Sequence, residues 1–191
     1  MMSRPLKVTA VSGSYKLPSR TAALVEAITQ QLGKQLPIDL HLIELSEISS
    51  SLVASYDPKA LPLKVQKDIQ AIETADLLVV ATPVYRASYT GLFKHLFDLV
   101  DYEALVDVPV LLAATGGSER HALIIDHELR PLFSFFQALT LPIGVYATEA
   151  DFENYQVKSE AVTARIALAV ERALPLLKHR ELINKDRLLA V

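Results

Sequence analysis

Fully apolar runs recur along the chain, and each ends in a short segment of small or turn-forming residues. The runs at 8–11, 77–81 and 107–114 lack alternating polar positions, which is typical of parallel strands buried on both faces. Residues 38–45 instead alternate apolar and polar positions, which predicts a strand at the edge of the sheet. A short final strand is predicted at 143–146.

Apolar residues at helical spacing occupy the segments between these runs. Helices are therefore predicted at 19–33, 65–75, 89–100, 121–139 and 162–177. Pro131 and Pro175 predict a kink or an end within the last two helices, because proline lacks the N–H that the helical ladder needs. The connection at 46–62 contains three consecutive serines, Tyr56 and two prolines, so we expect a long irregular loop of the kind that often binds ligands.

Strands that alternate with helices form a parallel sheet with right-handed crossovers and helices on both faces. The pattern predicts an α/β fold, a flavodoxin-like three-layer sandwich whose five-stranded parallel sheet has the order 2-1-3-4-5. We expect residues 1–191 to form a single domain, with about 180–191 as a C-terminal tail. Ligands of such sheets bind beyond the carboxyl ends of the strands, where the strand order reverses between strands one and three.

The composition narrows the classes of partner. The 191 residues have a net charge of −3 and no basic stretch, so we expect no nucleic-acid partner and no membrane partner. The chain contains no cysteine, which excludes disulfides and thiol chemistry and agrees with a cytoplasmic location. Its apolar runs are short, so we expect neither a signal peptide nor a membrane-spanning segment.

The segment between the first strand and the first helix is rich in hydroxyl groups. Its candidate phosphate ligands are Ser12, Ser14, Ser19, Arg20 and Thr21. A helix N-terminus is positive and Arg20 adds a charge-assisted donor, so this turn is suited to a phosphate dianion. It lacks the Gly-Lys-Ser/Thr ending of magnesium-nucleotide loops and two of the three glycines of the Rossmann fingerprint. A structural alternative is that the serines only cap the helix.

Two further turns follow the third and fourth strands. The residues Pro83, Val84, Tyr85 and Arg86 combine a rigid backbone with an aromatic ring and free amides that suit a planar ligand. The segment Thr115, Gly116 and Gly117 lets a ligand approach the backbone closely, because glycine has no Cβ. Taken singly, each segment is equally consistent with an ordinary turn, so the prediction depends on the convergence of all three at one sheet edge.

No metal site and no acid–base pair is expected. His121 and His127 are six residues apart and do not share a helix face, so they do not form a pair of metal ligands. Asp98 and Asp101 are expected at a solvated helix end.

Together the three segments resemble the NADPH-dependent FMN reductases of the flavodoxin-like superfamily. In that family a GSxxxxSRT-type loop, here Gly13–Ser14 with Ser19–Thr21, holds the FMN phosphate. A TPxY segment, here 82–85, lies beside the isoalloxazine, and a TGG segment, here 115–117, closes the other edge of the ring. The strings ATPVY, GLFKHLFDLV and LLAATGG look most like the reductase component of two-component alkanesulfonate or methanesulfonate monooxygenases.

The resemblance implies hydride transfer from NADPH to FMN, with reduced FMN supplied to a partner monooxygenase in sulfonate use. It also implies a homodimer or homotetramer with the helix after TGG at the interface. In that subfamily this helix has a one-residue insertion that forms a π-bulge with an aromatic residue, and the aligned position here is His127. Hydride transfer needs stacked rings rather than a general base, so no catalytic side chain is expected.

Three alternatives remain open from the sequence. A quinone, azo or chromate reductase that retains FMN would use the same fold and phosphate loop. An electron carrier of the flavodoxin type would also bind FMN, although such carriers are shorter and strongly acidic, whereas this chain is only mildly acidic. A flavin-free interaction domain would leave each turn with an ordinary structural role.

Overall fold

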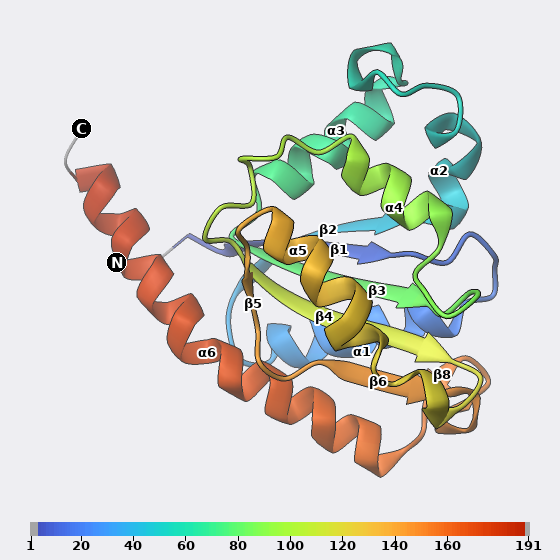
Figure 1. Cartoon of the computed structure of the whole chain (residues 1–191). Helices are drawn as coiled ribbons and strands as arrows, with labels where there is room; N and C mark the ends of the chain where they lie inside the picture. The colour runs from blue at the N-terminus through green and yellow to red at the C-terminus, as the bar shows by residue number, and fades with distance from the viewer. Residues whose placement is uncertain (1–3, 190–191) are drawn as a thin grey trace.

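A parallel β-sheet forms the centre of the computed structural model, which describes residues 4–189 (Figure 1). Its strands are β1 (Leu6–Ser12), β2 (Ile38–Glu44), β3 (Leu77–Pro83), β4 (Pro109–Gly116), β5 (Leu139–Thr140) and β6 (Val145–Thr148). They lie in the order β2-β1-β3-β4, and both β5 and β6 pair with β4. The predicted flavodoxin-like order 2-1-3-4-5 is confirmed, with the fifth position shared by two short strands.

The division of the fifth strand has a local cause. β5 pairs with the start of β4 and β6 pairs with its end. Pro142 lies between them and has no N–H to donate to the ladder. Gly144 follows, and a Cβ there would lie 2.7 Å from Cγ2 of Ile125, so the backbone needs glycine to pass this side chain. The strand predicted at 143–146 therefore begins two residues later, at Val145.

Helices cover both faces of the sheet, as predicted (Figure 1). Helices α1 (Arg20–Gly33) and α6 (Glu160–Leu189) lie on one face, and α2 (Leu45–Leu52), α3 (Leu63–Glu73), α4 (Gly91–Asp98) and α5 (Arg130–Phe135) lie on the other. Alternate residues of β3 supply the two cores, because Leu77 and Val79 pack under α1 and α6 whereas Leu78 and Val80 pack under the opposite helices. Both faces of β3 are thus buried, which explains its uninterrupted apolar sequence.

Short elements complete the described chain. They are the 3₁₀ turns η1 (Pro58–Ala60), η2 (Glu119–His121) and η4 (Glu149–Asp151), the π-helical turn η3 (Ile125–Leu129), and a hairpin of β7 (Phe152–Glu153) and β8 (Gln156–Val157). The helix predicted at 121–139 is therefore a succession of η2, η3 and α5. Pro131 occupies the second position of α5, where its missing N–H costs little, so the interruption comes before the proline.

The prediction of a long irregular loop at 46–62 is wrong. α2 begins at Leu45, and its buried residues Leu45, Ile48 and Leu52 follow a helical spacing that the serines between them do not disrupt. η1 forms within the same segment, so the connection contains regular structure. The apolar anchoring of α2 outweighs the low helix propensity of serine, because packing routinely overrides propensity.

Of the kink or end predicted at Pro175, the end is wrong, because α6 continues through this residue to Leu189. The proline is exposed, so the carbonyl that loses its helical partner faces water rather than the core. Residues 180–189 of the predicted tail continue α6, while 190–191 lie outside the described residues. Of the helices within 4–189, none combines the length and apolar character that a membrane crossing requires.

Candidate functional site

The three predicted turns meet at one cavity of about 250 Å³ beyond the carboxyl ends of β1, β3 and β4. Most of the predicted site residues line it, namely Ser14, Ser19, Arg20, Thr21, Pro83, Val84, Tyr85, Thr115, Gly116 and Gly117. The register of the sheet sets this arrangement, because Pro83 lies opposite Thr115 on the adjacent strand. The topology therefore brings together residues about a hundred positions apart.

Two predicted site residues lie elsewhere. Ser12 is the last residue of β1 and only 1% exposed, so it is enclosed by the sheet and does not line the cavity. Arg86 is exposed at the tip of the turn after β3, and it is also outside the cavity lining. The sequence placed both residues next to the correct turns, but it did not give the direction of their side chains.

The hydroxyl-rich turn presents the start of α1 to the cavity. Ser19 is the N-cap of this helix and accepts a hydrogen bond from the Ala22 N–H at 3.1 Å. Ser14 shapes its own loop, because its Oγ donates to the Lys16 carbonyl at 3.1 Å and accepts from the Lys16 N–H at 3.3 Å. The first turn of α1 contains no acidic residue, so its positive end is not neutralised from within. This arrangement fits a phosphate group.

A buried pair of hydroxyl groups joins two of the turns. The Oγ1 atoms of Thr21 and Thr115 are 2.7 Å apart, and the two residues are 2% and 7% exposed. The pair fixes the start of α1 against the end of β4. It therefore sets the spacing between the segment suited to phosphate and the glycine segment.

The guanidinium of Arg20 has two neighbours that the sequence did not predict. Its Nη1 atom lies 3.1 Å from Oε1 of Glu149, and its Cζ atom lies 5.7 Å from the centre of the Tyr155 ring. Both neighbours line the cavity. Glu149 follows β6, so the rule that ligands gather at carboxyl ends of strands would have found it. Tyr155 gave no such signal, because it is in the turn of the β7–β8 hairpin with a φ of 58°.

The turn after β3 is a tight two-residue hairpin. Tyr85 and Ser88 exchange backbone hydrogen bonds of 2.9 and 3.2 Å, and Arg86 and Ala87 between them have φ values of 52° and 68°. These values correspond to the left-handed region used by type I′ turns. Ser88 Oγ also donates to Oε2 of Glu128 in η3 at 2.8 Å, which anchors the turn to the π-helical segment.

Tyr85 lines the cavity, and the ring of Tyr15 packs against it. The ring centres of Tyr15 and Tyr85 are 5.5 Å apart in an edge-to-face arrangement, and the residues are 38% and 37% exposed. Each ring therefore keeps accessible surface. The N–H groups of Val84 and Tyr85 donate to the Thr115 and Ser88 carbonyls at 2.8 and 2.9 Å, so the amides that the sequence predicted for ligand contact are not free. The exposed aromatic surface of this turn is still suited to a planar ring.

Tyr146 on β6 supports the glycine segment from behind. Its hydroxyl donates to the Ser118 carbonyl at 2.6 Å, and a Cβ built at Gly116 would lie only 2.1 Å from the same hydroxyl oxygen. Burial, followed by the negative charge of Glu119, raises the pKa of Tyr146, so the phenol remains a protonated donor at neutral pH. A side chain at position 116 would therefore require the Tyr146 ring or the glycine segment to shift.

The π-helical turn contains His127. The Arg130 N–H donates to the Ile125 carbonyl across five residues, which is the hydrogen bond of a π-helix. His127 is exposed in this turn, at the position where the resemblance placed a π-bulge. Among the side chains that the structure describes, residues 4–178, no group of three or more His, Asp or Glu is arranged to hold a metal ion.

Asp151 fixes the turn that carries Glu149. The backbone N–H and the hydroxyl of Thr148 donate to Asp151 Oδ2 at 2.7 and 2.8 Å. Burial raises the pKa of Asp151, but the hydrogen bonds from Thr148 and Ser159 outweigh it, so the pKa lies below its usual range. The carboxylate form is thus the one that the folded state prefers.

Asp151→Asn is expected to lower the free energy of unfolding by about 1 kcal/mol at pH 7, through the loss of charge-assisted hydrogen bonds. A lowered pKa means that the unfolded state takes up the proton first. The contribution is therefore complete above about pH 4 and disappears as the pH falls through the folded-state pKa. Urea unfolding of the unmodified protein and of Asp151→Asn at pH 7 and pH 3 measures this contribution. A difference in unfolding free energy that stays constant with pH would contradict a lowered pKa of Asp151.

Comparison with known proteins agrees with this geometry. The family model described as NADPH-dependent FMN reductase matches residues 6–153, which include all three turns. A solved structure of an oxidoreductase from Corynebacterium diphtheriae superposes with a TM-score of 0.80 at 35% identity, covering 93% of this chain and 99% of that one.

Two relatives match almost the whole chain. The protein named NADH-dependent FMN reductase SfnF from Pseudomonas fluorescens (strain Pf0-1) is 64% identical over 175 residues, which is 92% of this chain and 94% of that protein. A protein of Pseudomonas aeruginosa named FMN reductase (NADPH) is 59% identical over 184 residues, covering 96% of this chain and 99% of the relative. The first name specifies NADH as the nicotinamide nucleotide and the second specifies NADPH.

Proposed function

Because the chain belongs to the NADPH-dependent FMN reductase family, we propose that it reduces FMN as a diffusible substrate and supplies reduced FMN to a partner monooxygenase. The chain is an oxidoreductase that acts on FMN with a nicotinamide nucleotide. We also propose that the nucleotide is NADPH and that the partner is a monooxygenase of organosulfur (sulfonate) metabolism. The proposed location is cytoplasmic. These proposals rest on the resemblance of the three turns.

One observation supports the proposal most strongly. Three turns that are each ordinary alone line a single cavity at the point where the strand order reverses. One end of the cavity is suited to the phosphate and is formed by the first turn of α1 together with Ser14, Ser19 and Thr21. The other end is suited to the ring and is formed by Tyr85 and Gly116. The cavity fits FMN in the chemistry of both ends.

The reaction requires position rather than acid–base catalysis. A hydride passes from C4 of the nicotinamide to N5 of the flavin, leaving the oxidised nucleotide and reduced FMN. The turn at 85–88, anchored by Glu128, and the glycine segment, supported by Tyr146, hold the two ends of the ring site. These residues are expected to orient the flavin so that the nicotinamide stacks on its open face.

Oxidation of NADPH and of NADH, each with and without free FMN, tests the function. We expect the rate to rise with free FMN until it saturates, and the ratio of kcat/KM for the two nucleotides to report the donor. A purified protein that stays yellow, and that oxidises NADPH with an added quinone but gains nothing from free FMN, would instead establish a reductase that retains its flavin. A stable semiquinone without nucleotide oxidation would establish an electron carrier.

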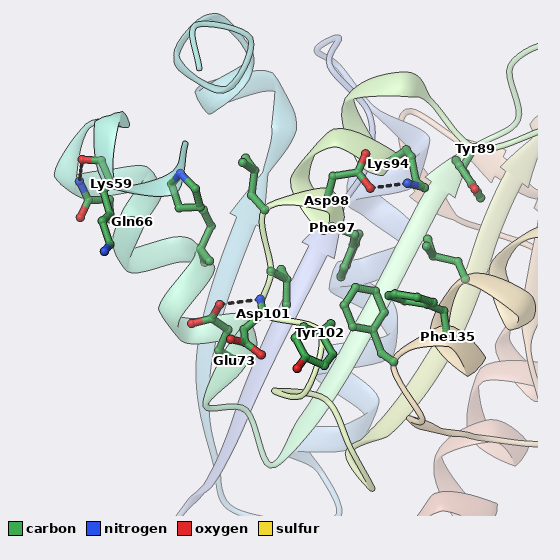
Figure 2. A pocket seen from close by; sticks show the side chains of 16 residues that line it. Lys59, Gln66, Glu73, Tyr89, Lys94, Phe97, Asp98, Asp101, Tyr102 and Phe135 are labelled. Carbon is green, nitrogen blue, oxygen red and sulfur yellow. Dashed lines mark hydrogen bonds and ion pairs between the residues drawn. The ribbon is translucent and has the colours of Figure 1, made fainter. Parts of the chain in front are cut away.

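We also propose that the chain forms a homodimer or homotetramer through the face made by α3, α4 and α5. A groove of about 910 Å³ runs along this face, and Tyr102 and Phe135 expose 62% and 69% of their surface beside it (Figure 2). Its lining contains both signs of charge, with Lys59 and Lys94 basic and Glu73, Asp98 and Asp101 acidic, and Lys94 pairs with Asp98 within the chain. A second copy related by a two-fold axis would pair opposite charges across such a surface.

Phe135→Glu is expected to dissociate the assembly at this face and lower its mass, because it places a charge within the proposed contact. Light scattering after size exclusion measures the mass. Val53→Glu is the matched control, since Val53 is also 61% exposed but lies at the end of α2, outside the groove lining. A Phe135→Glu protein with the mass of the unmodified assembly would contradict the proposed interface.

A further inference from the structure

Glu149 places a negative charge at the end of the cavity that is suited to a phosphate. Its Oε1 atom is 3.1 Å from Arg20 Nη1, and both residues line the cavity beside the first turn of α1. The Cζ atom of Arg20 lies over the Tyr155 ring, 5.7 Å from the ring centre. The guanidinium is therefore held by a carboxylate and an aromatic ring of the chain itself.

An anion that enters this cavity competes with that carboxylate. Arg20 has to leave Glu149 or be shared with it, and sharing brings the carboxylate close to the incoming negative charge. The side chains of Arg20 and Glu149 are 40% and 62% exposed, so the pair is solvated and can exchange partners at a modest cost. The cost is small, so the competition would lower the affinity for the anion without preventing its binding.

Hydrogen bonds within its own turn fix the position of Glu149. The residue begins η4, whose N-cap Thr148 is joined to Asp151 by hydrogen bonds of 2.7 and 2.8 Å. The β7–β8 hairpin follows directly and carries Tyr155, whose ring lies beside the guanidinium. One short segment thus supplies both groups that occupy Arg20.

We propose that Glu149 is a counter-charge that competes with the flavin phosphate for Arg20 and keeps the affinity for FMN low enough for flavin exchange. The inference rests on the proposed function, because it concerns how the same site binds and releases FMN. It makes Glu149 a residue that sets affinity and specificity, while the hydride transfer itself does not involve it.

Glu149→Gln tests this with two flavins that differ only in the phosphate. We expect the Kd for FMN, measured by quenching of flavin fluorescence, to fall about fivefold, because Arg20 is freed and a nearby negative charge is removed. Riboflavin lacks the phosphate, so its Kd is expected to change by less than about twofold. Glu153→Gln is the matched control, since Glu153 pairs with Lys158 in the neighbouring hairpin and is outside the cavity lining. It is expected to leave both Kd values unchanged.

The outcomes separate this inference from the proposed function. An unchanged ratio of the two Kd values in Glu149→Gln, or a weaker affinity for FMN, would overturn the role of Glu149 while wild-type FMN binding stands. Equal changes for both flavins with a lower melting temperature would assign Glu149 a purely structural role and overturn the inference as well. Failure of the unmodified protein to bind FMN at all would instead overturn the proposed function.

Discussion

Gly116→Ala is expected to lower kcat/KM for FMN reduction about a hundredfold. The added methyl group would lie 2.1 Å from the hydroxyl oxygen of Tyr146, so the glycine segment or the Tyr146 ring that packs against it has to shift. A displacement of about 1 Å at a ring-binding segment is enough for an effect of this size, because hydride transfer depends on the stacking geometry. Steady-state kinetics with varied FMN measures the change.

Tyr146→Phe provides the test of that mechanism. Alone it removes the 2.6 Å hydrogen bond to the Ser118 carbonyl and is expected to cost about 1 kcal/mol of stability. Combined with Gly116→Ala it removes the clashing oxygen, and the next ring atom is 3.1 Å from the added Cβ. The double variant is therefore expected to recover part of the lost activity. A double variant no more active than Gly116→Ala would contradict the steric account.

Ser14→Ala combined with Arg20→Ala is expected to raise the Kd for FMN about thirtyfold, since together they remove about 2 kcal/mol of charge-assisted and neutral hydrogen bonding to the phosphate. The free energy of unfolding should fall by less than about 1 kcal/mol, because Arg20 forms an exposed ion pair. Fluorescence titration and urea unfolding provide the two values.

The comparison of these two losses is the informative result. Ser19 remains in place as the N-cap of α1, so the double variant does not remove the cap that stabilises the helix. Losses of equal size in binding and in stability would favour a capping role for the whole turn. An unaffected Kd for riboflavin in the same protein would locate the effect at the phosphate.

The fold could be predicted because its central strands are buried on both faces. Residues such as Leu77 and Leu78 pack into opposite cores, so β3 is a continuous apolar run that periodicity alone detects. The two-part fifth strand could not be predicted, since it depends on Pro142 and on the close passage of Gly144 against Ile125. Contacts between segments decide such details, and a local pattern does not contain them.

The site was predictable where it depends on strand order and not where it depends on side-chain direction. Turns at carboxyl ends of adjacent strands had to meet, and Ser14, Tyr85 and Gly116 accordingly line one cavity. Ser12 occupies the same end of β1 but points into the sheet, as its 1% exposure shows. Tyr155 reaches the cavity through the left-handed turn of its hairpin. The residue types around Tyr155 do not predict that it lies there.

The proposal that FMN is a diffusible substrate is tested most directly by the number of FMN molecules that each chain reduces. Under anaerobic conditions, with reduced nicotinamide nucleotide and a large molar excess of free FMN, the flavin absorbance is followed at catalytic protein concentration. We expect the absorbance to bleach to completion, with many equivalents of FMN reduced per chain. Bleaching that stops at one equivalent per chain would show a retained flavin and contradict this proposal.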